Sequence, residues 1–102
     1  MYDMKNLAKL KTIEVNAPDP LKAFWAFDKA AMAGGAIPVK YKELMALAVA
    51  FTTQCPYCIE IHAKRAREAG VSDQELAEAV AVAAALRAGA AITYGTHAFV
   101  DH

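Results

Sequence analysis

The chain has 102 residues, of which 57% are hydrophobic, and its 11 basic and 11 acidic side chains cancel to a formal net charge of zero. This length suits one domain with a single modest core, and the charge balance gives no reason to expect nucleic acid or an anionic membrane as a partner. So small an interior cannot bury all of that apolar surface, which favours a homo-oligomer.

The N-terminal residues and the cysteine content indicate the compartment. Residues 1–6 contain no apolar stretch, so no secretory signal is expected. The longest uncharged run, residues 44–59, is shorter than the roughly 20 residues that a membrane span needs. Two closely spaced cysteines do not make a disulfide framework. We therefore expect a cytoplasmic protein with no membrane partner, whose cysteines rest as thiols.

Hydrophobic spacing predicts two helices in the N-terminal third. Residues 2–14 carry Leu7, Leu10 and Ile13 at i, i+3 spacing, which is typical of a short amphipathic helix. A break over residues 16–20 precedes a second helix, which we expect Gly34 and Gly35 to end as C-terminal glycines. Its broad aromatic face is assigned to the core or to an interface, and comprises Leu21, Phe24, Trp25, Phe27 and Ala31.

A third helix is predicted from Pro38 to about Thr53. Its buried stripe consists of Leu44, Leu47, Ala48 and Phe51. Glu43 is the last charged residue before the long uncharged run, and a helical wheel aligns it with Leu47, Ala50 and Gln54. Spacing alone favours a glutamate that faces water near the helix start, where it complements the helix dipole.

Two further helices complete the chain. The fourth is predicted from Pro56 to Ala69, with Gly70 as its stop, and its charged second half is assigned to solvent. Ser72 and Glu75 match a capping box, which opens a long alanine-rich helix that Gly89 and Gly95 loosen at its end. No alternating strand pattern of useful length occurs. The fold class is therefore predicted as all-α, a bundle of about five or six helices.

The two cysteines lie at the start of the fourth helix. Pro56 suits the first helical position, which makes Cys55 the N-cap and places Cys58 in the first turn. Free N–H groups and the positive end of the helix dipole favour a thiolate there, which is the nucleophilic and redox-active form. His62 follows Cys58 by four residues, so both side chains share one face of the helix.

Three kinds of site remain open for this Cys-Pro-Tyr-Cys motif. A glutaredoxin has the same four residues but needs a strand before them, whereas the preceding residues here have a helical period. Zinc could be held by the two cysteines with His97 and His102, although a mostly helical stretch separates the pairs and His102 ends the sequence. A redox dithiol on a helical scaffold agrees best with the predicted elements.

The residues Glu43, Cys55, Cys58 and His62, with eleven, two and three residues between them, resemble the core of the AhpD-like alkylhydroperoxidases in the carboxymuconolactone decarboxylase superfamily. The similarity runs from about residue 37 to residue 98, and it favours Glu43 as a site residue rather than a surface one. It implies a single AhpD-like domain over residues 1–102, with N-terminal helices in 1–36 and the dithiol core in 37–98.

The resemblance also implies an activity and roles for the candidate catalytic residues. Cys58 would attack a hydroperoxide, Cys55 would resolve the sulfenic acid as a disulfide, and Glu43 and His62 would relay protons. An external thiol reductant, a lipoyl-bearing or thioredoxin-like protein, would restore the dithiol, and neither a cofactor nor a resident metal is implied. Some members have a histidine immediately before the second cysteine, where this chain has Tyr57. His97 is expected to be an exposed residue near the C-terminus, with an approach to the site as the alternative.

Overall fold

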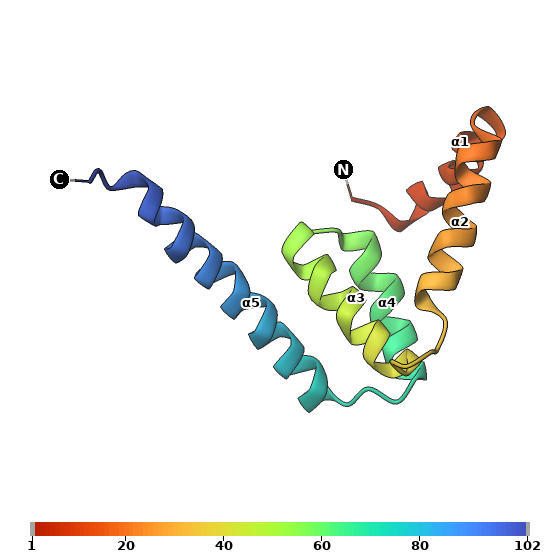
Figure 1. Ribbon diagram of the computed structural model, residues 1–102. Coiled ribbons are helices and arrows are strands. Elements are labelled where there is room, and N and C mark those ends of the chain that lie inside the picture. Colours follow the sequence, from red (N-terminus) through yellow and green to blue (C-terminus); the bar gives the residue numbers. More distant parts are fainter. Residues whose placement is uncertain (1, 102) are drawn as a thin grey trace.

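A computed structural model describes residues 2–101 and contains five α-helices, two short 3-10 helices and no strand within that range (Figure 1). The all-α prediction is therefore confirmed. In chain order the elements are η1 (Met4–Lys9), α1 (Leu10–Asn16), α2 (Pro18–Met32), α3 (Val39–Thr53), α4 (Pro56–Glu68), α5 (Asp73–Gly95) and η2 (Thr96–Ala98).

The core lies where α3 packs against α4 and the first half of α5. Leu47 of α3 is fully buried, and Ala66 of α4 and Val71 of the following loop complete the buried cluster. The predicted stripe of α3 points to this core, because Leu44 and Phe51 also pack against the cluster. The partly buried side chains around it are Leu44, Phe51, Ile59, Ala63 and Leu76.

The prediction of an amphipathic α-helix over residues 2–14 is wrong in helix type for its first half. Residues 4–9 form a 3-10 helix, and α-helical geometry begins only at Leu10. The i, i+3 spacing that suggested an α-helix fits a 3-10 helix equally well, because that helix has three residues per turn. The side chain of Asp3 accepts a hydrogen bond from the Lys5 N–H at 2.9 Å, which fixes the start of this tighter turn.

Helix α2 ends in a different way from the predicted glycine cap. Its last residue is Met32, and Ala33 leaves the helix in an extended conformation before either glycine. The carbonyl groups of Ala31 and Ala33 are instead satisfied by the ammonium group of Lys42 from α3, with the Ala31 contact at 2.8 Å. A cation at this position both satisfies free carbonyl groups and complements the helix dipole.

The aromatic face of α2 is not part of the core of a single chain. The exposed fractions are 49% for Phe24, 39% for Trp25 and 69% for Phe27. Trp25 donates a hydrogen bond to Glu14 of α1 at 3.0 Å, which holds the two N-terminal helices together. The core assignment is thus wrong for these residues, and the interface assignment remains a prediction.

The boundaries of α4 and the start of α5 agree with the sequence signals. Gly70 ends α4 with a φ of +89°, and the N–H of Val71 returns to the carbonyl of Ala66 at 2.9 Å, as in a Schellman motif. The Ser72–Glu75 capping box is present, with both of its hydrogen bonds formed. Helix α5 then continues through Gly89 without interruption, so the expected loosening there does not occur.

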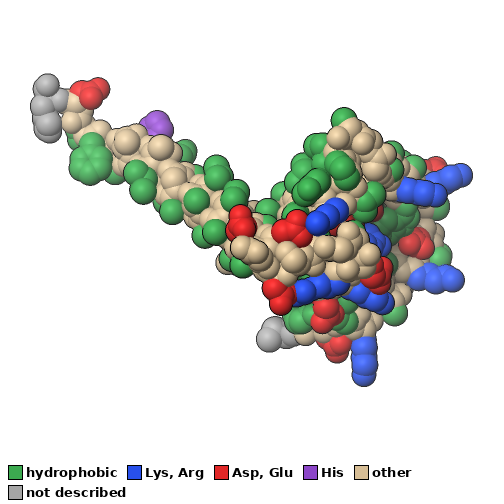
Figure 2. All heavy atoms as spheres, turned by 90° about the horizontal axis from the view of Figure 1, so that it is seen from below, with side chains coloured by type: hydrophobic (Ala, Val, Ile, Leu, Met, Phe, Trp, Pro, Cys, Tyr) green, Lys and Arg blue, Asp and Glu red, His purple; other side chains and the backbone are tan. Residues whose placement is uncertain are grey.

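Beyond its contact with α3, helix α5 projects away from the other helices (Figure 1). Charged side chains gather on the packed helices and are scarce along the projecting part until its tip (Figure 2). Several large apolar residues there are exposed, among them Leu86 at 66% and Ile92 at 74%. By length and composition alone, residues 73–98 could span a membrane. The sequence analysis considered only uncharged runs, and Arg87 divides this segment into shorter ones.

Candidate functional site

A sharp reversal between α3 and α4 positions the candidate site. Gln54 ends α3 with a φ of +57° and a ψ of +46°, a left-handed conformation that is uncommon for residues other than glycine. The Cys55 N–H then bonds to the carbonyl of Ala50 at 3.2 Å. This turn lets α4 pack back along α3, so residues from both helices reach the same region.

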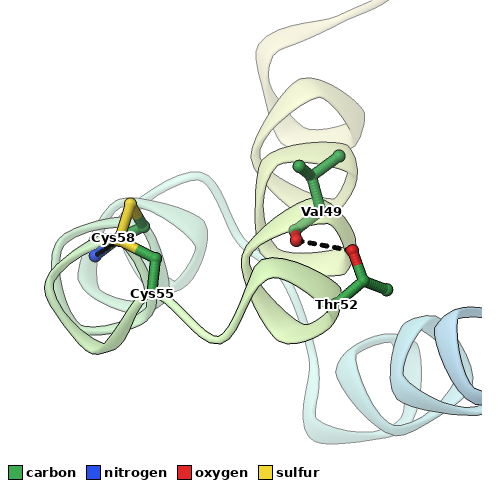
Figure 3. The surroundings of a disulfide bond; sticks show 4 residues. All are labelled: Val49, Thr52, Cys55 and Cys58. Atoms are coloured by element: carbon green, nitrogen blue, oxygen red, sulfur yellow. Dashed lines mark hydrogen bonds between the residues drawn. A yellow bond between two sulfur atoms is a disulfide. The ribbon is translucent and has the colours of Figure 1, made fainter.

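Cys55 and Cys58 form a disulfide at the start of α4 (Figure 3). Cys55 is the N-cap, as the sequence predicts, and its sulfur accepts a hydrogen bond from the Cys58 N–H at 3.3 Å. Pro56 takes up the first helical position and brings the two α-carbons to 5.3 Å. Both cysteines are half-buried. The expectation that the cysteines rest as thiols is therefore wrong for this structure, because the first turn of α4 holds the pair at a distance that a disulfide can bridge.

Glu43 and His62 form a pair between α3 and α4. The Oε2 atom of Glu43 lies 2.7 Å from the Nδ1 atom of His62, and Glu43 is only 4% exposed. The water-facing glutamate favoured by spacing alone is therefore wrong, because Glu43 lies on the same face of α3 as the buried Leu47 and Ala50. The donor in this contact depends on the tautomer of His62: with the proton on Nδ1, the carboxylate accepts it and Nε2 is left as the base.

The four residues of the spacing pattern thus come together in one region. His62 lies one helical turn after Cys58, and the carboxylate of Glu43 reaches that imidazole from the neighbouring helix. A half-buried disulfide, an imidazole one helical turn further along and a buried carboxylate behind the imidazole can together support thiol–disulfide and proton-transfer chemistry.

Tyr57 makes contacts that the sequence reasoning did not identify. Its hydroxyl oxygen accepts a hydrogen bond from the side chain of Asn6 at 3.2 Å and lies 3.4 Å from the Asp3 N–H. The ring of Tyr2 meets the Tyr57 ring edge-on, with centroids 5.1 Å apart. Partial burial there, and secondly the nearby carboxylate of Glu60, raise the pKa of Tyr2. Nothing in the sequence around Tyr57 indicates contacts with residues so far away in the chain.

His97 lies away from the cysteine pair within one chain. It belongs to η2 at the far end of α5, is exposed, and has its ring 4.9 Å from that of Tyr94 (Figure 1). The expectation of an exposed C-terminal histidine is confirmed. His102, the other histidine of the zinc alternative, lies outside the described residues. Within residues 2–101, no three His, Cys, Asp or Glu side chains gather in a way that could hold a metal ion.

Known proteins share both the sequence and the fold. The model of the carboxymuconolactone decarboxylase family matches residues 18–101. A protein from Paracoccus denitrificans, described as uncharacterized protein 4 in the cox locus, is 47% identical over 76 residues, which cover 74% of this chain and 68% of that protein. The alkyl hydroperoxide reductase AhpD of Gluconacetobacter diazotrophicus is 43% identical over 60 residues, which cover 59% of this chain and 33% of that protein.

A solved structure agrees with these sequence relatives. The crystal structure of a carboxymuconolactone decarboxylase family protein from Legionella pneumophila aligns with a TM-score of 0.76 at 28% identity, over 90% of this chain and 82% of that one. The family match covers most of the chain, and the fold and the dithiol helix agree with it. This chain is therefore an AhpD-like member of the carboxymuconolactone decarboxylase family.

Proposed function

We propose that this protein is a dithiol peroxidase, which reduces hydroperoxides through the Cys55–Cys58 pair. The observation that carries the proposal is the buried Glu43 at 2.7 Å from His62, one turn away from Cys58. Burying a carboxylate costs free energy unless the group has a polar partner. Here the partner is the imidazole of His62, one helical turn from Cys58. The AhpD relative supports the same chemistry by its name, although a third of its length is matched.

In the proposed reaction, His62 takes the thiol proton of Cys58 through Nε2, while Glu43 holds the opposite ring nitrogen. The Cys58 thiolate attacks the distal peroxide oxygen, the O–O bond breaks, and the alkoxide leaves as an alcohol with the proton from His62. Cys58 is then a sulfenic acid. The Cys55 thiol attacks that sulfur, the S–O bond breaks, and water leaves as the disulfide forms.

A second substrate must return the two electrons. A dithiol of an external protein, lipoyl-bearing or thioredoxin-like, attacks the Cys55–Cys58 disulfide, passes through a mixed disulfide, and leaves as a disulfide itself.

We place this cycle in the cytoplasm, where thiol reductants maintain such pairs. A membrane location for α5 is disfavoured because Arg87 would lie near the middle of the apolar segment, at a cost of about 2.5–3.5 kcal/mol.

The roles of the two cysteines are tested by separate substitutions. Reduced protein treated with one equivalent of an alkyl hydroperoxide is expected to lose both thiols and to yield the 55–58 disulfide by mass spectrometry. Cys58→Ser is expected to abolish peroxide consumption, and Cys55→Ser to accumulate a sulfenic acid that dimedone traps. Undiminished peroxide turnover by Cys58→Ser would show that the assignment of the attacking residue is wrong.

A general dithiol–disulfide oxidoreductase is the second candidate, and the half-buried disulfide at a helix N-terminus favours it independently of any peroxide. The two functions differ in the oxidant that turns over. With one electron donor held fixed, rates with a set of hydroperoxides are compared with rates on a set of small disulfides and one oxidised protein. Faster turnover of the disulfides would favour the second candidate.

A further inference from the structure

The segment from Tyr2 to Asn6, which we name the N-terminal strap, lies over the first turns of the dithiol helix. Three of its residues contact Tyr57, the residue directly before Cys58: Tyr2 through its ring, Asp3 through its N–H and Asn6 through its side-chain amide.

The strap is ordered by bonds within itself before it meets α4. The carboxylate of Asp3 accepts from the Lys5 N–H at 2.9 Å, and the carbonyl of Asp3 accepts from the Asn6 N–H at 2.8 Å. These bonds hold Asp3 and Asn6 in a single turn, so that both present a donor to the same hydroxyl group. The contacts join residues 51 and 54 positions apart in the sequence.

The size of a reductant decides whether the strap obstructs it. Tyr57 directly precedes Cys58 and follows Cys55 by two residues, and a helix with side chains is about 10–12 Å across, so a segment that contacts Tyr57 lies within about one helix diameter of the disulfide. Even a small redox encounter between two proteins buries several hundred Å² on each partner, a patch more than about 20 Å across. We therefore expect such a patch to meet the strap, whereas a small dithiol is small enough to pass it.

We propose that the N-terminal strap and Tyr57 determine which reductants reach the Cys55–Cys58 disulfide, admitting small dithiols directly and folded protein dithiols only when the strap opens. Tyr57 is in this view a specificity-determining residue that does not touch the reacting atoms. The inference rests on the proposed redox role of the pair. The step concerned is thiol–disulfide exchange: the reductant's first thiolate attacks one sulfur, and its second thiol releases the reduced protein as the reductant becomes a disulfide.

The test follows reduction of the oxidised protein, with no peroxide present, so its result is independent of the proposed peroxidase activity. Second-order rate constants are measured with dithiothreitol and with reduced thioredoxin for the wild type, Asn6→Ala and Tyr57→Phe. Lys11→Ala, an exposed position on α1, is the matched control. Asn6→Ala removes the side-chain hydrogen bond to Tyr57, and Tyr57→Phe removes the acceptor of both this bond and the Asp3 N–H contact. Each variant is expected to increase the open population by at least about fivefold, and the thioredoxin rate with it.

The ratio of the two rates separates selection by the strap from a general structural effect. We expect the dithiothreitol rate to change by less than about twofold in every variant, because a small dithiol already reaches the sulfurs. Equal changes with both reductants would overturn the proposal, since they indicate an altered disulfide. An unchanged or lower thioredoxin rate in both variants would overturn it as well. Circular dichroism confirms that each variant is folded, and Tyr57→Phe retains the ring contact should Asn6→Ala unfold the segment.

Discussion

At the scale of single residues, Glu43 defines the site, because a charged side chain is almost never buried without a partner. Its carboxylate is 4% exposed and contacts one imidazole at 2.7 Å. The same burial places it beside Leu47 and Ala50, the most buried positions of α3. In the proposed peroxidase, Glu43 would therefore be a positioning residue, which fixes the ring of His62.

Replacement of Glu43 by glutamine separates charge from shape. We expect Glu43→Gln to lower the rate of Cys58 oxidation by hydroperoxide by at least about tenfold, because a neutral amide aligns and stabilises the protonated imidazole less well. The free energy of unfolding should fall by only about 1 kcal/mol, since the amide can still accept the hydrogen bond. Stopped-flow oxidation kinetics and urea unfolding measure the two effects. An unchanged oxidation rate would exclude the positioning role.

The residues of the site differ in how far the sequence could predict them. Cys55, Cys58 and His62 lie within one helix, so their mutual placement follows from the helical repeat, and the N-cap assignment is confirmed. Glu43 depends on how α3 packs on α4, which the spacing pattern suggested only through the family resemblance. The partners of Tyr57 were not predictable, because no local rule connects a tyrosine with a turn more than fifty residues earlier.

At the scale of elements, the capping box of α5 connects the last helix to α3. The Glu75 carboxylate accepts from the Ser72 N–H at 2.9 Å and forms an ion pair with Lys40 at 3.0 Å. The hydrogen bond from the Ser72 backbone, and secondly Lys40, lower the pKa of Glu75. The start of α5, and with it the direction in which the helix projects, is therefore held by an ionised carboxylate.

This lowered pKa has a consequence for the pH dependence of stability. A carboxyl group with a lower pKa in the folded state stabilises the protein above its unfolded pKa, and this contribution is lost as the pH falls through the folded value. We expect Glu75→Gln to lower the melting temperature at pH 7 and to approach the wild type as the pH falls below 4. Glu78→Gln controls for the loss of one negative charge on α5. A difference that stays constant between pH 7 and pH 3 would contradict this account.

The helices themselves were largely predictable, because proline and glycine mark their boundaries and apolar spacing marks their faces. The exceptions arise where tertiary contacts decide. Helix α2 ends at Met32 because Lys42 of α3 caps it, which its own sequence cannot indicate. Likewise, an i, i+3 spacing does not separate a 3-10 helix from an α-helix over residues 4–9.

At the scale of the whole molecule, a single chain exposes more surface than a compact protein of its mass. Its accessible area is 7876 Å², whereas a folded monomer of 10.9 kDa has roughly 5,600 Å². The radius of gyration is 17.4 Å, against about 13 Å for a compact chain of this length. The excess is roughly 2,300 Å² per chain, so two chains that covered it would bury roughly 4,600 Å² in total, which is within the range of obligate subunit interfaces.

The projecting part of α5 and the aromatic face of α2 account for this excess. Both carry exposed apolar side chains, and the face of α2 was predicted to lie in the core or in an interface. A helix that is apolar all round is normally buried. The exposed apolar part of α5 therefore offers a surface on which copies of this chain could associate. The division into N-terminal helices over residues 1–36 and a dithiol core over 37–98 remains a prediction.

We therefore predict that the wild type sediments as a homo-oligomer, a trimer or a hexamer, at micromolar concentration. Leu86 and Ile92 are 66% and 74% exposed in one chain, and burial of each against a partner would contribute about 1.5–3 kcal/mol. The double variant Leu86→Glu/Ile92→Glu introduces two charges into that contact, so it should shift the protein to monomers. Lys64→Glu, on the charged face of α4, should leave the assembly intact. A wild type that sediments only as a monomer would mean that α5 remains uncovered in solution, and the apolar composition of its projecting half would then need another partner.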